Sequence, residues 1–532
     1  MSLETKGKEQ VNLLLKRARR NTLGDLLERT KERNPDKNAI AYKGECITYS
    51  ELDNMVNQTA NAFVNAGMKK GDHIVIMSKN SQDFVTAMFA LARIGAVMIP
   101  VNYMLSRDDV SYILHHAEVT GLIASEEYAV LLDQVAQELT IQFRYLMDVP
   151  ASQEGIQSDW TTLSSARKDE LTVPVLADLD DDDLAHVLYT SGTESRPKGV
   201  MLTHKSIISE YVSSIIDGKM EEKDIAIHAL PLYHSAQLHV FLGPSIYIGS
   251  SGIILSQADP ESLLRTIEEE GATQLFCPPT VWIALLRHPA FDNYNLSTLE
   301  KCYYGAAIMP KEILKELAER LPNARFWNFY GQTEVAPLAT ALQPEDQLRK
   351  LGSAGKPTLN VQTKIVGENG VEVARGVIGE IVHRTSHAMK GYLHDPEKTA
   401  EAFQDGWFHS GDLGTMDEEG YITIIDRKKD MINTGGVNVS SREVEESLYQ
   451  MEGVSEVAVI SIPDPYWIEA VTAIIVPKKG ASLSEEEVVA FCRERLSTFK
   501  VPKQVEFTDV LPKNPSGKVL KRALRDQYGN IN

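Results

Sequence analysis

The chain has little cysteine and no long apolar run. Four cysteines occur in 532 residues, and none stands in a Cys-x-x-Cys pair or at zinc-ligand spacing from a histidine, so thiol-based metal and redox sites are disfavoured. So few thiols suit a reducing cytosol, and we predict a cytoplasmic protein. No apolar stretch reaches the roughly 18–20 residues that span a bilayer. The start also lacks the apolar core and cleavage site of a secretory signal.

Positive charge is scarce as well. The chain carries 54 lysines and arginines against 74 aspartates and glutamates, a formal net charge of −20. General nucleic-acid binding leaves a basic footprint and is therefore disfavoured, whereas a small anionic ligand could still bind at a local basic cluster. Residues 1–21 form a basic extension in which Leu13–Leu15 lie beside four cations. We interpret it as a solvated leading helix, with at most peripheral membrane contact.

Hydrophobic patterning predicts an α/β fold for most of the chain. The composition, 43% hydrophobic and 24% charged, is that of a globular protein. Ser50 is predicted to cap a helix, with Asp53 three residues later. A strand at 73–77, a helix through 84–94 and a strand at 96–100 then follow the order that is typical of parallel sheets.

The pattern changes after the charged turn 427–430. Beyond it, residues 440–452 and 484–496 are predicted helices, and 457–462 and 470–477 are predicted strands. This is a compact α+β unit. The predicted division is a basic extension at 1–21, a large N-terminal domain at 22–426, a hinge at 427–430 and a small mobile α+β domain at 431–532.

The most informative segment runs from Tyr189 to Val200 and follows a predicted strand. Hydroxyls, glycines and Lys198, placed on a strand-to-helix turn, can present donors to phosphate oxygens. The segment is not a Walker A loop, because Pro197 stands where that motif needs glycine. It favours nucleotide binding over a simple turn.

Two further segments carry groups suited to a nucleotide. Asn328–Glu334 places aromatic rings next to a hydroxyl and a carboxylate, and Trp407–Gly414 places a carboxylate in a tight glycine turn. With Arg427 and Pro512–Lys518, these segments resemble, in order and spacing, the adenylate-forming superfamily of acyl-CoA synthetases, luciferases and peptide-synthetase adenylation domains. The resemblance covers nearly the whole chain.

The resemblance implies a large adenylate-forming domain of mixed sheets wrapped by helices, a small mobile domain, and an AMP-forming acid–thiol ligase. Such an enzyme uses ATP and Mg²⁺ to form an acyl-AMP and then transfers the acyl group to CoA. The site must supply positive charge and fixed donors where two anions meet. The residues implied to bind ATP or AMP are Thr190, Ser191, Gly192, Thr193, Lys198, Gly305, Ala306, Ala307, Asn328, Phe329, Tyr330, Gly331, Asp412 and Arg427.

Individual roles follow from the same resemblance. Tyr330 is implied to cover the adenine, and Asp412 to accept hydrogen bonds from the ribose. Thr333 is implied to contact the α-phosphate, and Glu334 to hold Mg²⁺ together with Thr193.

The small domain is implied to act twice. Lys518 would bridge the carboxylate and the α-phosphate in the first half-reaction, from a loop whose residues suit movement. The domain would then rotate about Lys429 and bring Gly435 and Gly436 to the site, where they would leave room for the pantetheine arm of CoA. Acetylation of Lys518 is a further hypothesis, since its neutralisation would switch adenylation off.

The acid is less well specified. His234 is implied to lie beside the substrate carboxylate, and Ser235 stands where amino-acid-activating relatives carry aspartate, so an amino acid is disfavoured. The pocket is predicted to be mainly apolar, which favours a medium- or long-chain fatty acid first and an aromatic acid second. Its predicted walls are Tyr233, Trp282, Tyr304 and Val335.

Alternatives stay open at this point. The acceptor could be a carrier protein instead of free CoA, and a homodimer is a further hypothesis. A nucleotide-binding relative without catalysis is disfavoured by the intact Lys198, Glu334 and Lys518. Glu194 and Ser195 depart from the family, whose phosphate loop usually has Thr-Gly there, and they place a negative charge near a triphosphate.

Overall fold

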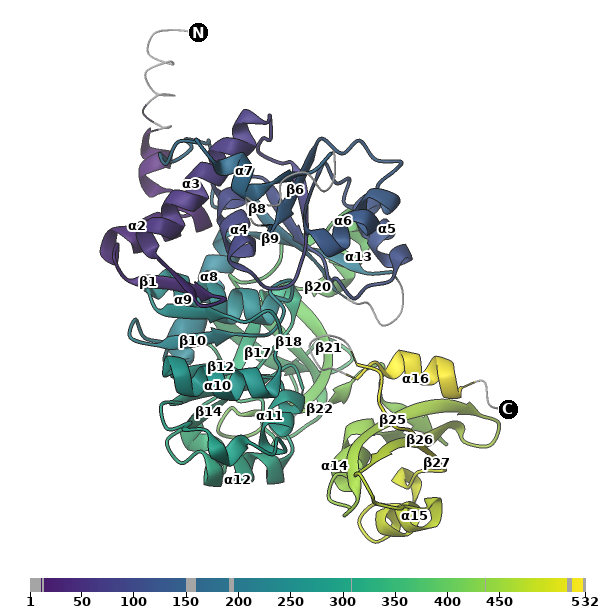
Figure 1. Cartoon of the computed structure of the whole chain (residues 1–532). Coiled ribbons are helices and arrows are strands. Elements are labelled where there is room, and N and C mark those ends of the chain that lie inside the picture. The colour runs from purple at the N-terminus through teal and green to yellow at the C-terminus, as the bar shows by residue number, and fades with distance from the viewer. Residues whose placement is uncertain are drawn as a thin grey trace.

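Two large sheets form the main body of the molecule (Figure 1). The structure is a computed structural model that describes residue 11 and residues 14–149, 159–190, 196–307, 309–435, 437–513 and 519–529. The first sheet contains, in spatial order, β16 (Lys356–Pro357), β15 (Leu338–Leu342), β14 (Arg325–Gly331), β13 (Lys301–Gly305), β12 (Gln274–Phe276), β10 (Ile225–His228), β11 (Ser251–Ile254), β1 (Asn38–Tyr42) and β2 (Glu45–Thr48). The second contains β19 (Gly391–Tyr392), β9 (Lys198–Thr203), β8 (Leu184–Thr190), β4 (Val97–Pro100), β3 (His73–Met77), β5 (Gly121–Ser125), β6 (Phe143–Met147) and β7 (Thr161–Thr162).

Helices connect the strands of both sheets. They are α2 (Leu23–Arg33), α3 (Tyr49–Asn65), α4 (Gln82–Ile94), α5 (Arg107–His116), α6 (Glu126–Val135), α7 (Leu163–Arg167), α8 (His204–Asp217), the π-helix η2 (Ala236–Leu242), α9 (Gly243–Ile248), α10 (Pro260–Glu270), α11 (Pro279–Leu286), α12 (Lys311–Arg320) and α13 (Pro396–Ala402). Short 3-10 turns lie at η3 (Phe291–Asn293), η4 (Thr333–Val335) and η5 (Pro344–Asp346).

A third sheet and a separate small unit complete the fold. The third sheet is formed by β17 (Val361–Val366), β18 (Gly379–Thr385), β21 (Trp407–Met416) and β20 (Phe403–Gln404), with β22 (Ile422–Arg427) also paired to β21. The fourth sheet contains β24 (Val437–Val439), β23 (Ile432–Thr434), β26 (Ile468–Pro477), β25 (Val454–Asp464) and β27 (Gln504–Phe507). With it lie α14 (Ser441–Leu448), α15 (Glu485–Arg493), η6 (Thr498–Lys500) and α16 (Lys521–Tyr528).

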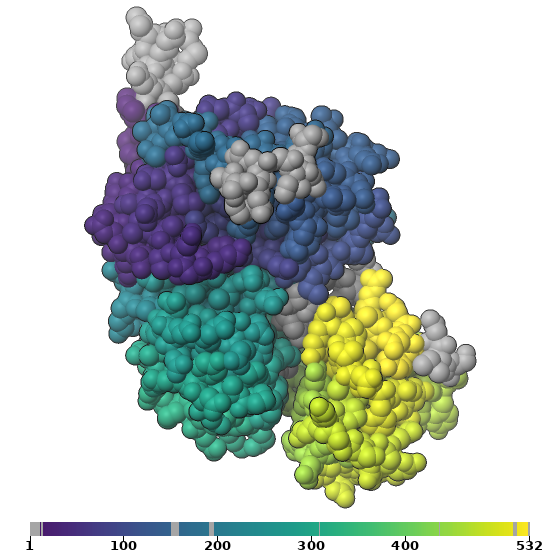
Figure 2. Space-filling model, in the orientation of Figure 1, coloured from purple at the N-terminus to yellow at the C-terminus, as the bar shows by residue number. Residues whose placement is uncertain are grey.

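We call the described residues up to Arg427 the large unit and those from Ile432 onward the small unit. Figure 2 shows the small unit, coloured from yellow-green to yellow, as a distinct body beside the large one. β25 and β26 of the small unit pair over their whole length, with Ala458 opposite Ile474. The large unit is α/β and the small unit is α+β, as the sequence predicted.

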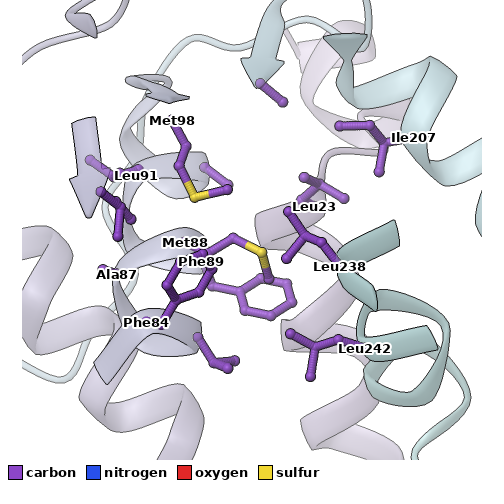
Figure 3. Close-up of a cluster of buried hydrophobic side chains, with 14 of the residues drawn as sticks. Leu23, Phe84, Ala87, Met88, Phe89, Leu91, Met98, Ile207, Leu238 and Leu242 are labelled. Carbon is purple, nitrogen blue, oxygen red and sulfur yellow. The ribbon is translucent and has the colours of Figure 1, made fainter. Parts of the chain in front are cut away.

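The main core sits around α4, whose mostly apolar side chains are buried from Asp83 to Ile94 (Figure 3). Phe84 and Met88 of this helix meet Leu23 of α2 and Leu238 and Leu242 of η2. A helix that is hydrophobic all round is stable only when it is covered on all faces. η2 begins two residues after His234, which is predicted to lie beside the substrate carboxylate. The packing of η2 therefore fixes the turn that carries His234 against the core.

The strand–helix–strand prediction near the N-terminus is confirmed. β3 and β4 pair in parallel, with Ile74 opposite Met98, and α4 lies between them in sequence. The predicted strand-to-helix turn at the phosphate loop is wrong. β8 and β9 pair antiparallel, with Thr190 opposite Lys198, so the loop joins two strands of a hairpin, because the β-prone run after Lys198 extends the sheet before α8 begins.

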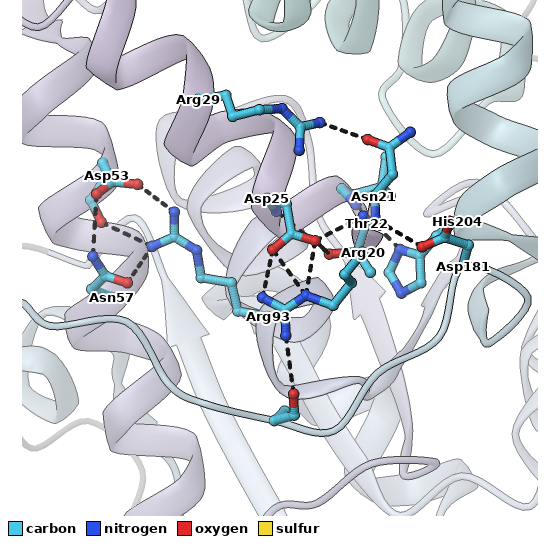
Figure 4. A network of polar contacts seen from close by, with 12 residues as sticks. Arg20, Asn21, Thr22, Asp25, Arg29, Asp53, Asn57, Arg93, Asp181 and His204 are labelled. Atoms are coloured by element: carbon cyan, nitrogen blue, oxygen red, sulfur yellow. Dashed lines mark hydrogen bonds and ion pairs between the residues drawn. The ribbon is translucent and has the colours of Figure 1, made fainter. Parts of the chain in front are cut away.

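The predicted helix cap at Ser50 is also wrong. Thr48 caps α3, since its hydroxyl accepts from the Glu51 N–H and the Glu51 carboxylate accepts from the Thr48 N–H. Asp53 is instead 2% exposed and pairs with the guanidinium of Arg93 (Figure 4). The threonine therefore starts the helix two residues earlier, and Asp53 is available to hold α3 against α4.

The basic extension is engaged with the large unit where the structure describes it. Lys16 Nζ lies 3.2 Å from Asp178, and Arg20 is paired with Asp25 and donates to the Ala177 carbonyl. Figure 4 shows the Arg20 and Asp25 side chains meeting. The acidic tract that begins at Asp178 therefore serves as a partner for these cations.

Candidate active site

The end of β14 is the centre of the candidate site. The strand stops at Gly331, where a Cβ atom would lie 1.7 Å from the Pro337 carbonyl oxygen, so only glycine fits this close approach of two backbones. The short turn η4 follows and holds Thr333 and Glu334, both half-buried. The sequence Tyr-Gly-Gln-Thr-Glu thus turns sharply at the edge of the first sheet.

Asp412 of β21 receives three donors at this edge. Its carboxylate accepts from the Tyr330 hydroxyl at 2.7 Å and from the Gln332 amide at 2.8 Å, and Arg427 Nε lies 3.1 Å from it. The pairing of β21 with β22 sets Arg427 directly opposite Asp412. Burial and the Asp412 carboxylate raise the pKa of Tyr330, so its hydroxyl remains a donor. The carboxylate is only 4% exposed and is rigidly held.

A second carboxylate, Glu334, lies beside the phosphate hairpin. Its Oε1 accepts from the Tyr392 hydroxyl at 2.9 Å, and the ammonium of Lys198 lies 4.7 Å from the centre of the Tyr392 ring. Tyr392 comes from β19, which is paired with β9. The predicted Mg²⁺ ligand and the predicted pyrophosphate lysine therefore face one tyrosine.

The turn that carries His234 and Ser235, which is predicted to bind the substrate carboxylate, lies next to Thr333. Ser235 Oγ lies 3.2 Å from Thr333 Oγ1. The neighbouring His234 is half-buried, and its Nδ1 accepts from the Ala236 N–H at 3.2 Å. The hydroxyl of Thr333 is thus placed between the groups predicted to bind the acid and those predicted to bind the nucleotide.

The predicted adenine side is built from β13 and β14. Gly305 lies opposite Phe329, and a Cβ atom there would lie 2.4 Å from the Phe329 carbonyl oxygen. Ala306 and Ala307 follow and are exposed, whereas Asn328 donates to the Ser353 carbonyl at 2.9 Å. The Phe329 ring is buried against Phe241 and Tyr303 (centroids 6.0 and 5.3 Å), so only its backbone can reach a ligand at this edge.

Two of the four predicted pocket walls share one core cluster, and the other two pack elsewhere. Trp282 is 1% exposed and donates to the Tyr303 carbonyl, and Tyr304 donates to Gln347 in the same core cluster. Val335 belongs to the separate core around α4, and Tyr233 packs edge-on against Tyr103. The pocket assignment stays a prediction.

Several predicted residues lie outside the described part of the chain. They are Ser191, Gly192, Thr193, Gly436 and Lys518. Gly435 is described: its φ is +61° and its N–H donates to the Trp467 carbonyl at 2.6 Å. Lys429 lies at the junction of the units, just before Asp430, which pairs with Arg525 at 2.7 Å.

Sequence reasoning missed residues that hold the predicted ones. Gln332 donates to Asp412 and to the Ser410 carbonyl, and Tyr392 donates to Glu334. Glu380 accepts from the Gly411 N–H at 3.0 Å and so fixes the turn before Asp412. Gln332 stands inside the segment Asn328–Glu334. Nothing in the spacing of Tyr392 or Glu380 along the chain indicates their partners.

The comparisons with known proteins agree with this geometry. The AMP-binding enzyme family matches residues 27–393, and the C-terminal domain of AMP-binding enzymes matches residues 443–518. The chain belongs to the AMP-binding enzyme family. This confirms the resemblance carried by the motifs, and with it the fold class.

Relatives of this AMP-binding enzyme span nearly its whole length. A feruloyl-CoA synthase from Amycolatopsis sp is 35% identical over 95% of this chain and 99% of its own. A long-chain-fatty-acid–CoA ligase from Bacillus subtilis strain 168 is 33% identical over 95% of this chain and 94% of its own. The crystal structure of ATP-bound MatB from Rhodopseudomonas palustris has a TM-score of 0.87 and 31% identity, covering 96% of this chain and 99% of its own. The prediction of an AMP-forming acid–thiol ligase is confirmed at the level of this class.

Two kinds of feature are absent from the described residues. Within the ranges given above, none of the helices is both long and apolar enough to cross a membrane. In the same ranges no group of three or more histidines, cysteines or carboxylates is arranged to hold a metal ion.

Proposed function

We propose that this AMP-binding enzyme activates a medium- or long-chain fatty acid to an acyl-AMP, with release of pyrophosphate, and then transfers the acyl group to CoA. The observation that carries the proposal is the position of Thr333. Its hydroxyl lies 3.2 Å from Ser235 Oγ on the acid side, and the next residue, Glu334, is bonded to Tyr392 on the phosphate side. The groups for both reactants thus converge at one point.

The Asp412 cluster supports the proposed binding of adenosine. A carboxylate that accepts from Tyr330 and Gln332 and lies 3.1 Å from Arg427 Nε has a fixed orientation. Fixed acceptors of this kind suit the vicinal hydroxyls of a ribose. Arg427 ends β22 at the junction of the units, so the proposed ribose site lies next to the proposed hinge.

The phosphate side supports the binding of ATP as its Mg²⁺ complex. Oxygen ligands are those that Mg²⁺ prefers, and Glu334 offers a half-buried carboxylate whose partner Tyr392 has its ring centre 4.7 Å from Lys198 Nζ. In the proposed mechanism, Lys198 and Glu334 hold the pyrophosphate portion with its cation, while the Thr333 hydroxyl donates at the α-phosphate. These groups offset the negative charge that builds up when the carboxylate attacks.

The proposal assigns the small unit two tasks. Lys518 would supply the cation between the two reacting anions, and Gly435 and Gly436 would admit the thiol arm of CoA after rotation about Lys429. The left-handed φ of Gly435 (+61°) supports the role proposed for this glycine, because a residue with a side chain would be strained at that position.

A panel of acids tests the proposal. The protein is assayed with ATP, Mg²⁺, CoA and saturated acids from acetate to palmitate, with benzoate, cinnamate and ferulate beside them, and the release of pyrophosphate and the thioester are measured. The proposal predicts the highest kcat/KM with acids of medium or long chain. A maximum at acetate, or thioester formation only with a carrier protein as acceptor, contradicts it.

An aryl-CoA ligase is the second candidate. It is favoured by the 35% identity to a feruloyl-CoA synthase and by the aromatic surroundings of the acid side. Tyr233, next to His234, packs edge-on against Tyr103, and its buried hydroxyl has no hydrogen-bond partner among the described residues. The same panel decides: a maximum at cinnamate or ferulate selects this candidate.

A further inference from the structure

Tyr392 links the two charged groups on the phosphate side of the site. It is 7% exposed, its hydroxyl donates to Glu334 Oε1 at 2.9 Å, and Lys198 Nζ lies 4.7 Å from its ring centre. A hydrogen bond to an ionised acceptor is stronger than one between neutral groups, and an ammonium over an aromatic face is attracted by the ring. One side chain therefore restrains a carboxylate and a cation together.

The backbone around Tyr392 is held just as firmly. Tyr392 lies opposite Val200 in the pairing of β19 with β9, and its N–H donates to Thr399 Oγ1 at 2.9 Å. The Leu393 N–H donates to the Gly199 carbonyl at 2.8 Å, one residue after Lys198. The tyrosine is thus fixed relative to the strand that carries Lys198.

The same segment also holds the backbone of Glu334. The Met389 N–H donates to the Glu334 carbonyl at 2.8 Å. The Tyr392 hydroxyl donates to the side chain of the same residue, at Glu334 Oε1. Both the main chain and the side chain of Glu334 are therefore restrained by residues 389–392.

We propose that Tyr392 is a positioning residue that orients the Glu334 carboxylate and thereby gives the site its preference for ATP that carries a divalent cation over metal-free ATP. The inference rests on the proposed function, because that proposal makes Glu334 the protein ligand of the cation. Tyr392 itself touches neither reacting atom. It acts by holding Glu334 where one carboxylate oxygen faces the hydroxyl and the other remains available.

Equilibrium binding tests this without any turnover. Calorimetric titration with ATP is carried out in saturating Mg²⁺ and in its absence, and the ratio of the two affinities is taken as the metal preference. Tyr392→Phe keeps the ring and removes the hydroxyl, so it is expected to lower this ratio by about tenfold, as for the loss of one charge-assisted hydrogen bond. Affinity for metal-free ATP should change by less than about twofold, since the ring still faces Lys198.

Two further variants make the test specific. Tyr42→Phe is the matched control: Tyr42 donates to the Asp148 carboxylate at 3.0 Å in another part of the large unit, and its loss should leave the ratio unchanged. Glu334→Gln should lower the ratio, and adding Tyr392→Phe to it should have no further effect, because the tyrosine acts through that carboxylate.

The outcomes separate this inference from the proposed function. An unchanged ratio in Tyr392→Phe, equal losses with and without Mg²⁺, or additive effects in the double variant overturn the role of Tyr392. These results do not depend on whether any acid is activated. Failure of the acid panel, by contrast, overturns the proposed function even when the metal preference behaves as expected.

Discussion

Charged side chains are used differently in the two units. In the large unit, the Asp412 carboxylate accepts from the Tyr330 hydroxyl and the Gln332 amide and also pairs with Arg427. In the small unit and at its junction with the large unit, cations and carboxylates pair with each other: Lys521 Nζ lies 2.8 Å from Glu445 and Arg525 lies 2.7 Å from Asp430. Asp412 is thus held by neutral donors together with a cation, whereas α16 of the small unit is held by ion pairs.

The small-unit pairs also connect α16 to the proposed hinge. Lys521, at the start of α16, donates to Ser441 Oγ at 2.6 Å, and the Ser441 N–H donates to Asp426 at 2.7 Å. Lys521 lies three residues after Lys518 in the sequence. Because Asp426 lies before Lys429 and Ser441 after it, a rotation about Lys429 would have to change the contact between Ser441 and Asp426.

The two units differ most in their histidine content, and this difference gives the largest expected effect on stability. All 13 histidines lie at or before His409. Burial lowers the pKa of His204, His383 and His387 to about 4. Their folded-state pKa values lie below the unfolded value near 6.5, so their stabilising contribution is complete above pH 6.5 and is lost as the pH falls toward 4.

The large unit should therefore lose stability between pH 6.5 and 5, by about 1.4 kcal/mol per pH unit for each such histidine. Burial raises the pKa of the carboxyl groups of Glu210, Asp148 and Asp217, and these groups oppose the loss. Urea unfolding followed by tryptophan fluorescence tests this expectation. Trp467 is the tryptophan of the small unit, so the fluorescence of the unchanged protein minus that of the Trp467→Phe variant gives the signal of the small unit. If the urea midpoint reported by Trp467 shifts with pH as much as the midpoint reported by the other tryptophans, the expected difference between the units is contradicted.

Removing the cation of the small-unit cluster is expected to have the next largest effect. The carboxylates of Glu445 and Asp426 hold the pKa of Lys521 above its usual value although burial lowers it. Lys521→Met leaves Glu445 and its neighbours without that cation, so the small unit should lose about 3 kcal/mol. The Trp467 transition in urea measures it. Arg522→Met is the control, because Arg522 is exposed.

The two units should also differ in their effects on catalysis. Lys518→Ala is expected to lower acyl-AMP formation by about 100–1000-fold, as for the loss of a charge-stabilising donor, and largely to spare thioester formation from supplied acyl-AMP. Asp412→Asn should lower both steps, because the ribose is present in both. The two half-reactions are assayed separately with each variant. Equal losses in Lys518→Ala would show that its proposed role is wrong.

The smallest effect is expected from the basic segment at residues 500–525, which carries seven lysines and arginines. Two of these cations are already paired with carboxylates: Lys500 lies 2.6 Å from Glu443, and Lys513 lies 2.5 Å from Glu456. Lys513→Ala should change the stability by less than about 1 kcal/mol and the KM for CoA by less than about twofold. A rise of the KM for CoA by tenfold would instead make Lys513 a phosphate contact and weaken the contrast between the units.

Local sequence predicted much of the fold because the relevant signals are short-range. The alternation of apolar and polar residues predicted β3 and α4, and the capping residue Ser484 and the acidic turn after it predicted the start of α15. The cap of α3 was missed because Thr48 and Ser50 are both competent caps, and only the burial of Asp53 against Arg93 selects between them.

The sequence by itself determined the reaction class, because the order of the motifs and the residue types in them specify a family. It named Asp412, Thr333 and Glu334 but not what holds them. Only the tertiary structure decided that Tyr392, Gln332 and Glu380 hold these segments, since their separations along the chain carry no information about contact. It also decided that Trp282 and Phe329 turn into the core, because side-chain direction at a strand or helix end is set by packing and not by local pattern.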